Sequence, residues 1–564
     1  MQLLKSLTLR GGSEENQRPL TFSPATINIF VGPNNSGKSL LLRELSHLIR
    51  ENPRHNCRTV KAHIFNSLDD ATKAALTSRL VYKPGKNHDQ SPQFYYVGVR
   101  GVEQQVEKAD FQSCLADLHR QQAHLWVLRY LCLSLDGSNR LTMLAAQNRG
   151  DLMQPPPGLL SGLFRNDGKR LEVRRIIHAA IGSYFITDAT GSGNIRVRLS
   201  LVDPTPALER SFDDAALKFH DAAEPIENTS DGIRAFCGII ATVVESEPRI
   251  VFLDEPEAFL HPPLVVKLAK ALCEKAKASE QQYFVATHSA DFLMGCVQAG
   301  VDLNIVRMTY RDGLAAARLL PSEKIVPLMR NPLLRSTGVL DGLFYDSVIV
   351  TEADNDRSFY DEINHRLLSG KDETAGDDKQ RNDSKGIPNC LFLNAQNWQT
   401  VGQIIRPLRE LGVASAAVVD IDVVSAGDNT SFQNLLDAAG MPDGTRTALG
   451  QLRSGLKAHI VANKLEPKKK GVSALSGDHK ADLENLIKQL AEYGVFLVPV
   501  GELECWLPQL TRPGGESWLV QTFQAMGENP DDPKYVKPGD DDVWAFMGSI
   551  RAWLHNPKRL GMPQ

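Results

Sequence analysis

The sequence contains no long apolar run. Nothing in its 564 residues approaches the ~18 consecutive apolar residues that a membrane-spanning helix requires. The first segment, "MQLLKSLTLRGGSEENQRPL", also lacks the apolar core and the cleavage-site pattern of a secretory signal peptide. We therefore expect a protein that works without a membrane partner.

Cysteine is scarce, and its spacing does not suit metal binding or cross-linking. A zinc ribbon would need C-x-x-C pairs, and a disulfide framework is typical of a small secreted chain. Neither pattern is present, because the cysteines stand singly. They are Cys57, Cys114, Cys132, Cys237, Cys273, Cys296, Cys390 and Cys505. Isolated cysteines fit a reducing cytoplasm, where we expect the protein to reside.

A marked charge of either sign is also lacking. The formal net charge is -4, so any nucleic-acid surface must be a local basic patch. The composition, 42% hydrophobic and 23% charged, is ordinary for a globular protein. A chain of this length exceeds what one hydrophobic core usually organises, so two or more domains are predicted.

The first half of the chain alternates between strand-like and helix-like segments. Strands are predicted at 26–32, 249–255 and 282–289, and helices at 38–51 and 263–279. This alternation predicts a parallel sheet covered by helices. Between these segments, residues 51–220 mix hairpin-like and helical patterns, which predicts a large mixed α/β insertion or arm.

The second half shows a further alternation of the same kind. Strands are predicted at 347–352, 389–394, 414–422 and 495–500, and helices at 356–368 and 398–411. The polar stretch 369–386 is predicted to be a disordered surface loop. We place the boundary within Pro332–Leu343. The predicted fold is therefore α/β, with one domain over 1–335 and a second, ending in a helical extension, over 344–564.

A phosphate-binding loop is predicted in the first domain. The segment "GPNNSGKS" matches G-x-x-x-x-G-K-[ST] and lies between a strand and a helix, as a P-loop requires. Backbone N–H groups of such a loop bind phosphate at a helix N-terminus. Lys38 would contact the terminal phosphates of ATP, and Ser39 would hold Mg²⁺. The predicted ATP-binding residues are Gly32, Asn34, Asn35, Ser36, Gly37, Lys38 and Ser39.

A second apolar strand of this domain ends in acidic residues, in "IVFLDEPE". Asp254 would bind the Mg²⁺, and Glu255 would polarise the attacking water. The next strand ends at "ATHS", where His288 could reach the γ-phosphate. The order and spacing of these segments predict that the domain hydrolyses ATP.

The segments "LDEPEAFLHP" and "THS" resemble the ABC-type ATPases of the RecF/SMC group, especially the branch in OLD (overcoming lysogenization defect) nucleases. In that group a signature motif of one subunit completes the ATP site of another, which implies a homodimer or higher homo-oligomer. The matching segment here is "NTSDGIRAF", with Ser230 and Gly232 as ATP-binding candidates. It departs from LSGGQ, and an ordinary capped helix N-terminus remains the alternative. The insertion at 51–220 would be a dimerisation element.

Acidic residues cluster at strand ends in the second half. Residues two apart on a strand face the same side, and ligand crevices form at the carboxyl ends of parallel strands. Such a cluster would repel itself unless divalent cations bound it, so we predict Mg²⁺ or Mn²⁺ here. Two such ions can activate water for phosphodiester hydrolysis. The candidate ligands are Glu352, Asp356, Asp420, Asp422, Glu502 and Glu504.

This pattern resembles the TOPRIM (topoisomerase–primase) module over residues 346–506, with a glutamate after the first strand and D-x-D after the third. The resemblance implies catalytic roles for Glu352, Asp420 and Asp422. A basic residue often stabilises transition-state charge in such chemistry. Four lysines precede the last acidic pair: Lys464, Lys468, Lys469 and Lys470. One of them could assist cleavage, or all could form a solvated face that contacts phosphate.

An ABC-type ATPase followed by a TOPRIM unit is similar to the OLD family over nearly the whole chain. The resemblance implies an ATP-regulated, metal-dependent DNA endonuclease, with anti-phage effectors such as Gabija and some retrons among its relatives. A co-encoded helicase, or a reverse transcriptase with its nucleic acid, could then be a partner. Two alternatives stay open. One is a RecF-like, ATP-switched DNA clamp or sensor that does not cut, and the other is an RNA-directed nuclease.

Overall fold

The computed structural model describes residues 2–12, 18–51, 56–82, 93–99, 102–153, 156–311, 313–320, 322–369, 385–510 and 518–562. The chain divides into two compact units, Met1–Glu323 and Lys324–Gln564. This division lies before the segment Pro332–Leu343, where the sequence placed the domain boundary. Most of the stretch predicted to be a disordered loop, 369–386, lies outside the described residues.

The first unit is built on a mixed nine-stranded sheet, in the order β2-β1-β16-β15-β3-β14-β13-β8, with β4 paired to β1. Its strands are β1 (Leu4–Gly12), β2 (Pro19–Phe22), β3 (Ile27–Val31), β4 (Val60–Phe65), β8 (Cys132–Leu135), β13 (Ile250–Asp254), β14 (Gln282–Ala286), β15 (Leu303–Arg311) and β16 (Leu314–Leu320). The part from β15 through β3, β14 and β13 to β8 is parallel. The predicted parallel sheet is therefore confirmed for these five strands, whereas β2, β4 and β16 add antiparallel pairings.

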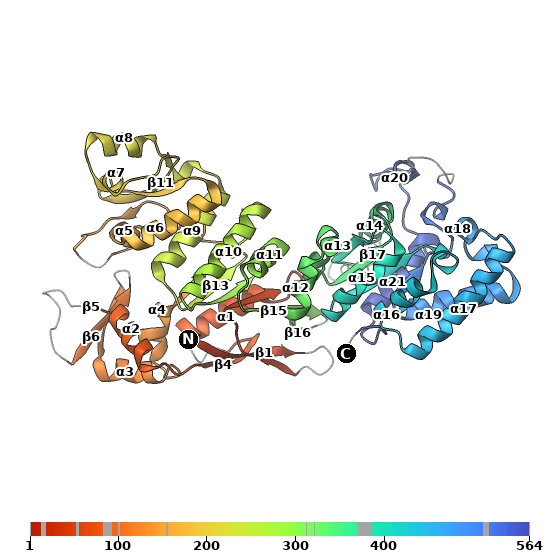
Figure 1. Ribbon diagram of the computed structural model, residues 1–564, viewed down its shortest axis with the longest axis horizontal. Helices are drawn as coiled ribbons and strands as arrows, with labels where there is room; N and C mark the ends of the chain where they lie inside the picture. The colour runs from red at the N-terminus through yellow and green to blue at the C-terminus, as the bar shows by residue number, and fades with distance from the viewer. Residues whose placement is uncertain are drawn as a thin grey trace. The chain divides into compact units, whose positions relative to one another are not determined.

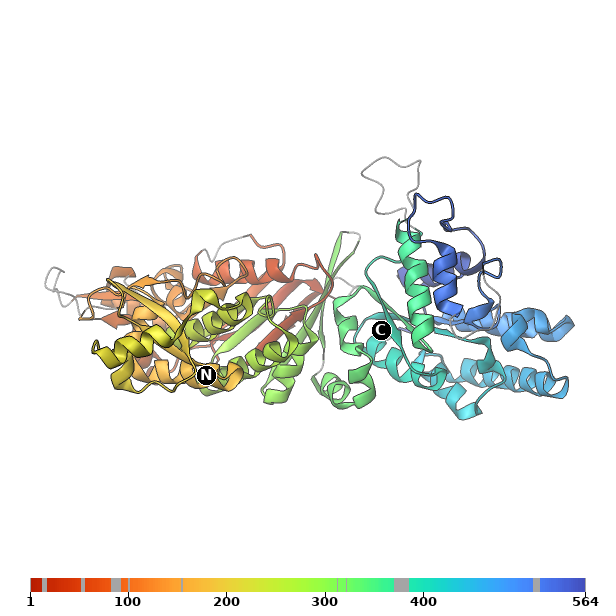
Figure 2. The same cartoon turned by 90° about the horizontal axis from the view of Figure 1, so that it is seen from above.

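Segments far apart in the sequence meet in this sheet. Figure 2 shows red strands from the beginning of the chain beside green strands from beyond residue 300. β3 and β13 carry the two predicted ATP motifs at their carboxyl ends, and β14 lies between them. The parallel arrangement thus brings both motifs to one edge of the sheet, because parallel strands all end on the same side.

Helices cover the parallel part of the sheet. They are α1 (Lys38–Arg50), α9 (Asp231–Ser246), α10 (Pro262–Ala278) and α11 (Ala290–Ala299). α1 contacts β8, β13 and β14, and buries Leu41, Leu45 and Ile49 completely. α9 is apolar over most of its length, and Phe236 and Ile239 are fully buried. This burial fixes the starts of α1 and α9, where the candidate ATP-binding residues lie.

The predicted insertion forms two separate groups of elements (Figure 1). One, in orange, is a three-stranded antiparallel sheet with two helices: α2 (Asp70–Leu80), β5 (Val81–Tyr82), β6 (Phe94–Val99), β7 (Val102–Glu107) and α3 (Lys108–Ala116). The other, in yellow, comprises β9 (Gln147–Asn148), α5 (Leu159–Arg165), α6 (Asp167–Ile181), β10 (Tyr184–Asp188), β11 (Asn194–Ser200), α7 (Pro206–Arg210), α8 (Asp214–Ala222) and β12 (Glu224–Pro225). β8 lies between these groups in sequence but belongs to the main sheet, so the interval is not one continuous insertion.

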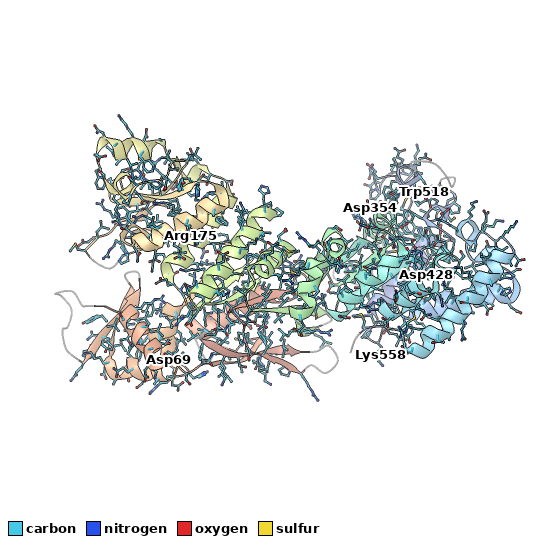
Figure 3. All side chains as sticks on the ribbon, viewed as in Figure 1. Asp69, Arg175, Asp354, Asp428, Trp518 and Lys558 are labelled. Atoms are coloured by element: carbon cyan, nitrogen blue, oxygen red, sulfur yellow. The ribbon has the colours of Figure 1, made fainter. Side chains whose placement is uncertain are left out.

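The second unit has a four-stranded parallel sheet in the order β18-β17-β19-β20. Its strands are β17 (Ser347–Thr351), β18 (Cys390–Asn394), β19 (Ala414–Val419) and β20 (Val495–Leu497). Its helices are α12 (Ser322–Arg330), which spans the division, α13 (Pro332–Ser336), α14 (Asp354–Ser369), α15 (Trp398–Glu410), α16 (Asn429–Ala438), α17 (Asp443–Ala462), α18 (Pro467–Lys470), α19 (Gly477–Glu492), α20 (Trp518–Met526) and α21 (Asp542–His555). In Figure 3 the labelled Asp354 marks the start of α14, just beyond the end of β17.

The carboxyl-terminal helix α21 completes the core of the second unit. Trp544 and Trp553 are 5% and 7% exposed, and both belong to one apolar cluster with Phe359 of α14 and Val418 of β19. Both tryptophans are therefore core residues. Across both units, none of the described helices has the length and apolar character to cross a membrane.

Candidate active sites

The predicted P-loop connects β3 to α1. Gly32 and Gly37 have positive φ angles of 141° and 92°. A Cβ on Gly32 would lie 2.0 Å from the backbone oxygen of Met308, so only glycine fits there. Lys38 is buried, and its Nζ donates to the backbone oxygens of Gly32 and Pro33, both at 2.8 Å. Burial lowers the pKa of Lys38 to about 8. The loop therefore encloses its lysine, as a phosphate cradle would.

The remaining P-loop residues differ in their exposure. Asn34 and Asn35 are exposed, whereas Ser36 is buried and accepts a hydrogen bond from Nζ of Lys38 at 3.3 Å. Ser39, the second residue of α1, donates to Oδ1 of Asp254 at 2.8 Å. Burial raises the pKa of the Asp254 carboxyl, although the hydrogen bond from Ser39 lowers it in part. A hydroxyl and a carboxylate held together in this way are hard oxygen donors that fit Mg²⁺, and they would hold it beside the loop.

Glu255 adopts a left-handed backbone conformation directly after β13. Its φ angle is 50°, and its backbone N–H donates to the oxygen of Ala286 at 2.8 Å. Its side chain is half-exposed, with Oε1 4.0 Å from Nε2 of His288. Burial, reinforced by repulsion from Lys38, lowers the pKa of His288 to about 4, so this imidazole is neutral at pH 7. The two predicted hydrolytic residues therefore lie side by side across the ends of β13 and β14.

Glu257 is a residue of this site that sequence reasoning missed. Its Oε1 accepts a hydrogen bond from the backbone N–H of His288 at 2.7 Å. Its Oε2 is buried and has no hydrogen-bond partner among the described residues. Burial raises the pKa of this carboxyl. The second glutamate of "DEPE" was the available signal, but only the fold shows that it holds His288.

The predicted signature segment lies at the start of α9. Ser230 is exposed and caps this helix, since its Oγ accepts from the backbone N–H of Ile233 at 3.4 Å. Gly232 packs against the chain that follows β13, because a Cβ there would lie 2.6 Å from the backbone oxygen of Phe259. The capping role is thus visible in the structure. A role for Ser230 and Gly232 at a second subunit's ATP site stays a prediction.

In the second unit, the ends of β17 and β19 bring predicted carboxylates together. Oε1 of Glu352 accepts a hydrogen bond from the backbone N–H of Asp420 at 2.7 Å. Asp356 lies in the first turn of α14 and accepts from the backbone N–H of Ala353 at 2.9 Å. Burial, reinforced by repulsion among neighbouring carboxylates, raises the pKa of Glu352 to about 7, of Asp356 to about 6 and of Asp420 to about 9. These carboxyl groups therefore resist ionisation.

Lys468 reaches this carboxylate cluster. Its Nζ lies 3.4 Å from Oε2 of Glu502 and 3.9 Å from Oδ2 of Asp422. Glu504 lies near enough to Asp356 to oppose its ionisation. By contrast, Lys469 pairs with the surface residue Glu466 at 3.0 Å.

The two other lysines, Lys464 and Lys470, are exposed and make no described ion pair. The structure therefore separates Lys468 from the three lysines that the sequence could not distinguish from it.

The carboxylates of this cluster do not surround a cation position among the described residues. Within the described ranges, no three carboxylate, histidine or cysteine side chains are arranged closely enough to hold an ion as they stand. Yet Oδ1 of Asp422 is buried without a hydrogen-bond partner among the described residues. An orphaned carboxylate oxygen beside mutually repelling carboxyls is a donor set that suits Mg²⁺ or Mn²⁺. The oxygen ligands of these residues are the kind that such a cation prefers. The carboxylate side chains would have to rotate to coordinate it.

Residues 184–295 match the family model "AAA domain, putative AbiEii toxin, Type IV TA system". The matched range includes Asp254, Glu255 and His288 and ends within α11. Together with the P-loop geometry on β3 and α1, this match supports an ATP-binding, AAA-type ATPase domain in the first unit. The match does not reach the second unit.

Solved structures with a similar arrangement include the SMC head bound to the C-winged helix domain of ScpA, at 14% identity and a TM-score of 0.34, with 57% of this chain and 99% of that chain covered. The SMC head domain from Thermotoga maritima is 15% identical with a TM-score of 0.28, and the match covers 57% of this chain and 100% of that chain. An ATP-binding cassette of an ABC transporter is 12% identical with a TM-score of 0.26, and the match covers 59% of this chain and 97% of that chain. TM-scores this low add nothing to the assignment. No curated protein matches the chain.

Proposed function

We propose that the protein is an ATP-regulated, divalent-metal-dependent DNA endonuclease of the OLD type. The observation that carries the proposal is the convergence of Glu352, Asp420 and Asp422 with Lys468 at the carboxyl ends of β17 and β19. Buried carboxyls with raised pKa values lower the stability of the folded state, and such groups are found preferentially at functional sites. The resemblance of this strand-end pattern to the TOPRIM module supports the same conclusion.

Each side chain has a chemical part in phosphodiester hydrolysis. The cations would be held by Glu352, Asp356, Asp420, Asp422, Glu502 and Glu504. Cations bound there would supply an activated water and stabilise the leaving oxygen. Glu502 holds the ammonium of Lys468 toward Asp422, where its charge can stabilise the pentacovalent phosphate. The exposed Lys464, Lys469 and Lys470 would contact the DNA backbone.

The first unit would bind and hydrolyse ATP in support of this activity. Lys38 would contact the terminal phosphates, Ser39 and Asp254 would hold Mg²⁺, and Glu255 with the neutral His288 would orient the attacking water. Ser230 would act at the ATP site of a second copy. ATP can change DNA cleavage only by binding more tightly to one conformation of the protein than to another.

The biological setting of the proposal is defence against phage in the bacterial cytoplasm. The name of the matching family model refers to a toxin of a type IV toxin–antitoxin system. An endonuclease whose cleavage activity is switched on by ATP binding, or by a co-encoded helicase or reverse transcriptase, would suit such a role. We propose a homodimer or larger homo-oligomer as the acting form.

A second candidate function is an ATP-switched DNA clamp or sensor that does not cut. One observation favours it: no three carboxylates of the described residues are preassembled around a cation position. A site that no longer had catalytic activity would be expected to lose its mutually repelling carboxyls, because their burial destabilises the fold. We therefore rank this function second.

Supercoiled plasmid distinguishes the two functions. Purified protein should nick or linearise the plasmid with Mg²⁺ or Mn²⁺, and EDTA should stop the reaction. Glu352→Ala should be inactive, whereas the matched control Glu484→Gln, a surface carboxylate on α19, should cut at the wild-type rate. Binding of plasmid without any cutting, in both metals and with or without ATP, would favour the clamp. An RNA substrate in parallel tests the third alternative.

A further inference from the structure

A short connector segment, residues 136–146, leaves the carboxyl end of β8 beside the ATP site. β8 pairs in parallel with β13, so the connector begins next to the end of the strand that carries Asp254 and Glu255. The sequence placed this segment inside an insertion and gave it no role. It contacts the end of β13 and the helix α9.

Arg140 of the connector is 1% exposed and binds the backbone at the end of β13. Its Nη1 donates to the backbone oxygen of Glu255 at 2.6 Å, and its Nη2 donates to the backbone oxygen of Asp254 at 2.5 Å. Two parallel donors on a planar guanidinium fit two successive carbonyl groups, which a lysine ammonium cannot match. Arg140 thus fixes the plane of the chain where the strand ends.

Glu255 is the residue whose backbone this clamp holds. It is not a glycine, yet its φ angle is 50°, in the left-handed region that side chains disfavour. Its N–H is held by the backbone oxygen of Ala286 and its carbonyl by Arg140. Strained conformations of this kind persist only where surrounding contacts determine them. The direction of the Glu255 side chain therefore depends on Arg140.

The same connector is joined to α9. Nη2 of Arg234 on α9 donates to the backbone oxygen of Leu141 at 3.0 Å. A Cβ on Gly238 would lie 3.3 Å from Cβ of Met143, so α9 and the connector pack closely. α9 begins at the cap residue Ser230, the candidate contact to a second ATP site. The contacts from Arg234 to Leu141 and from Arg140 to Glu255 therefore connect the first turns of α9 with the carbonyl of Glu255.

We propose that Arg140 is a positioning residue for ATP hydrolysis: it holds the Glu255 turn in its strained conformation and passes displacements of α9 to it. This inference rests on the proposed role of Glu255 in orienting the attacking water. The described hydrogen bonds of the Arg140 side chain go to the backbone of Asp254 and Glu255 and not to the P-loop. Loss of Arg140 should therefore slow turnover and leave ATP affinity nearly unchanged.

The test is a double-mutant cycle on the full-length protein, with Arg140→Lys, Arg140→Gln, Glu255→Gln and the two combinations. ATP turnover is measured under multiple- and single-turnover conditions, and ATP binding by a fluorescent analogue. We expect Arg140→Lys to lower kcat by about tenfold, with Arg140→Gln lower still, and KM to change by less than about threefold. In the Glu255→Gln background, either Arg140 change should have almost no further effect.

Arg174→Lys is the matched control. Arg174 is also a buried arginine of the first unit, but it holds Glu209 and the backbone of Phe185 far from the ATP motifs in sequence. Its substitution should lower the melting temperature and leave kcat per folded molecule unchanged. An equal loss of kcat in Arg174→Lys and Arg140→Lys would make Arg140 merely structural and overturn the proposal.

Two further outcomes separate this proposal from the proposed function. If Glu255→Gln is slow but Arg140→Lys turns over at the wild-type rate, the positioning role is wrong and the hydrolytic site stands. If Glu255→Gln itself turns over normally, the assignment of Glu255 is wrong and the role of Arg140 falls with it. Additive losses in the cycle would also overturn the proposal, because Arg140 would then act on something other than Glu255.

Discussion

The carboxylate of Glu352 accepts a hydrogen bond from the backbone N–H of Asp420 at 2.7 Å, which joins the ends of β17 and β19. This contact places two buried carboxyls at one edge of the parallel sheet. Burial raises the pKa of both carboxyls, repulsion from Glu352 raises that of Asp420 further, and repulsion from Asp422 and Asp356 raises that of Glu352. A cation would remove this repulsion, and the predictions for the second unit follow from that relationship.

Asp422→Ala should abolish nuclease activity without lowering the stability of the metal-free protein. The removed carboxylate has one buried oxygen without a described partner, and it opposes ionisation of Glu352 and Asp420. Plasmid cleavage should fall by at least about 100-fold, while the melting temperature in EDTA stays equal or rises. A variant that cuts at the wild-type rate would remove Asp422 from the site.

The metal-free second unit should become less stable as pH rises. The folded pKa of Glu352 is raised from 4.5 to about 7 and that of Asp420 from 3.8 to about 9. The folded state therefore holds more protons than the unfolded state between pH 4 and 9, so the stability present at low pH is lost through this window. Differential scanning fluorimetry in EDTA should show a fall on the order of 5 °C between pH 5 and pH 9.

Mg²⁺ should restore more of this stability at pH 8 than at pH 5, because protonated carboxyls bind cations poorly. Asp420→Asn should weaken the pH dependence in EDTA. A melting temperature that is independent of pH in the wild-type protein, or equal Mg²⁺ effects at both pH values, would show that the carboxyls ionise freely.

Lys468→Ala should impair cutting much more than Lys469→Ala. Lys468 lies beside Asp422 and Glu502, whereas Lys469 pairs with Glu466 on the surface. We expect a loss of about 10- to 100-fold for Lys468→Ala, and a small, salt-dependent loss for Lys469→Ala. Initial cleavage rates at two salt concentrations measure both. Equal losses would assign all the lysines to backbone binding.

Subunits with different ATP-site defects should complement each other if Ser230 acts across a dimer. Lys38→Ala should remove the proposed phosphate contact of its own site, and Ser230→Arg should block the proposed site of the neighbouring subunit. A mixture should regain one working site per heterodimer, so its ATPase activity should exceed that of either variant. No recovery, with subunit exchange verified by differently tagged chains, would leave Ser230 as a helix cap alone.

Local sequence predicted the parts of the structure that depend on near neighbours. The P-loop is one continuous segment whose glycines are required by its own backbone, so Gly32 and Lys38 could be assigned directly. The strand ends at Asp254, Glu352 and Asp420 were also predictable, because buried strands are apolar and stop at polar residues. These features need no knowledge of distant contacts.

The remaining features depend on contacts between distant segments. Arg140 and Glu255 are far apart in sequence, and nothing local distinguishes Arg140 from a surface arginine. Four neighbouring lysines look equivalent until α18 packs beside the residues that follow β19 and brings Lys468 to Asp422. The place of β8 in the main sheet was missed because its pairing with β13 is equally long-range.

The central claim is that ATP regulates a separate cutting site, and comparison of Lys38→Ala with Glu352→Ala tests it most directly. ATPase activity and plasmid nicking are measured for both variants, with and without ATP, after folding and oligomeric state have been verified. The account predicts that Lys38→Ala retains basal, metal-dependent nicking but loses its response to ATP, whereas Glu352→Ala retains ATPase and loses all cutting. If folded, oligomeric Lys38→Ala is as inactive on plasmid as Glu352→Ala, ATP is required to assemble the cutting site and the regulatory account is wrong.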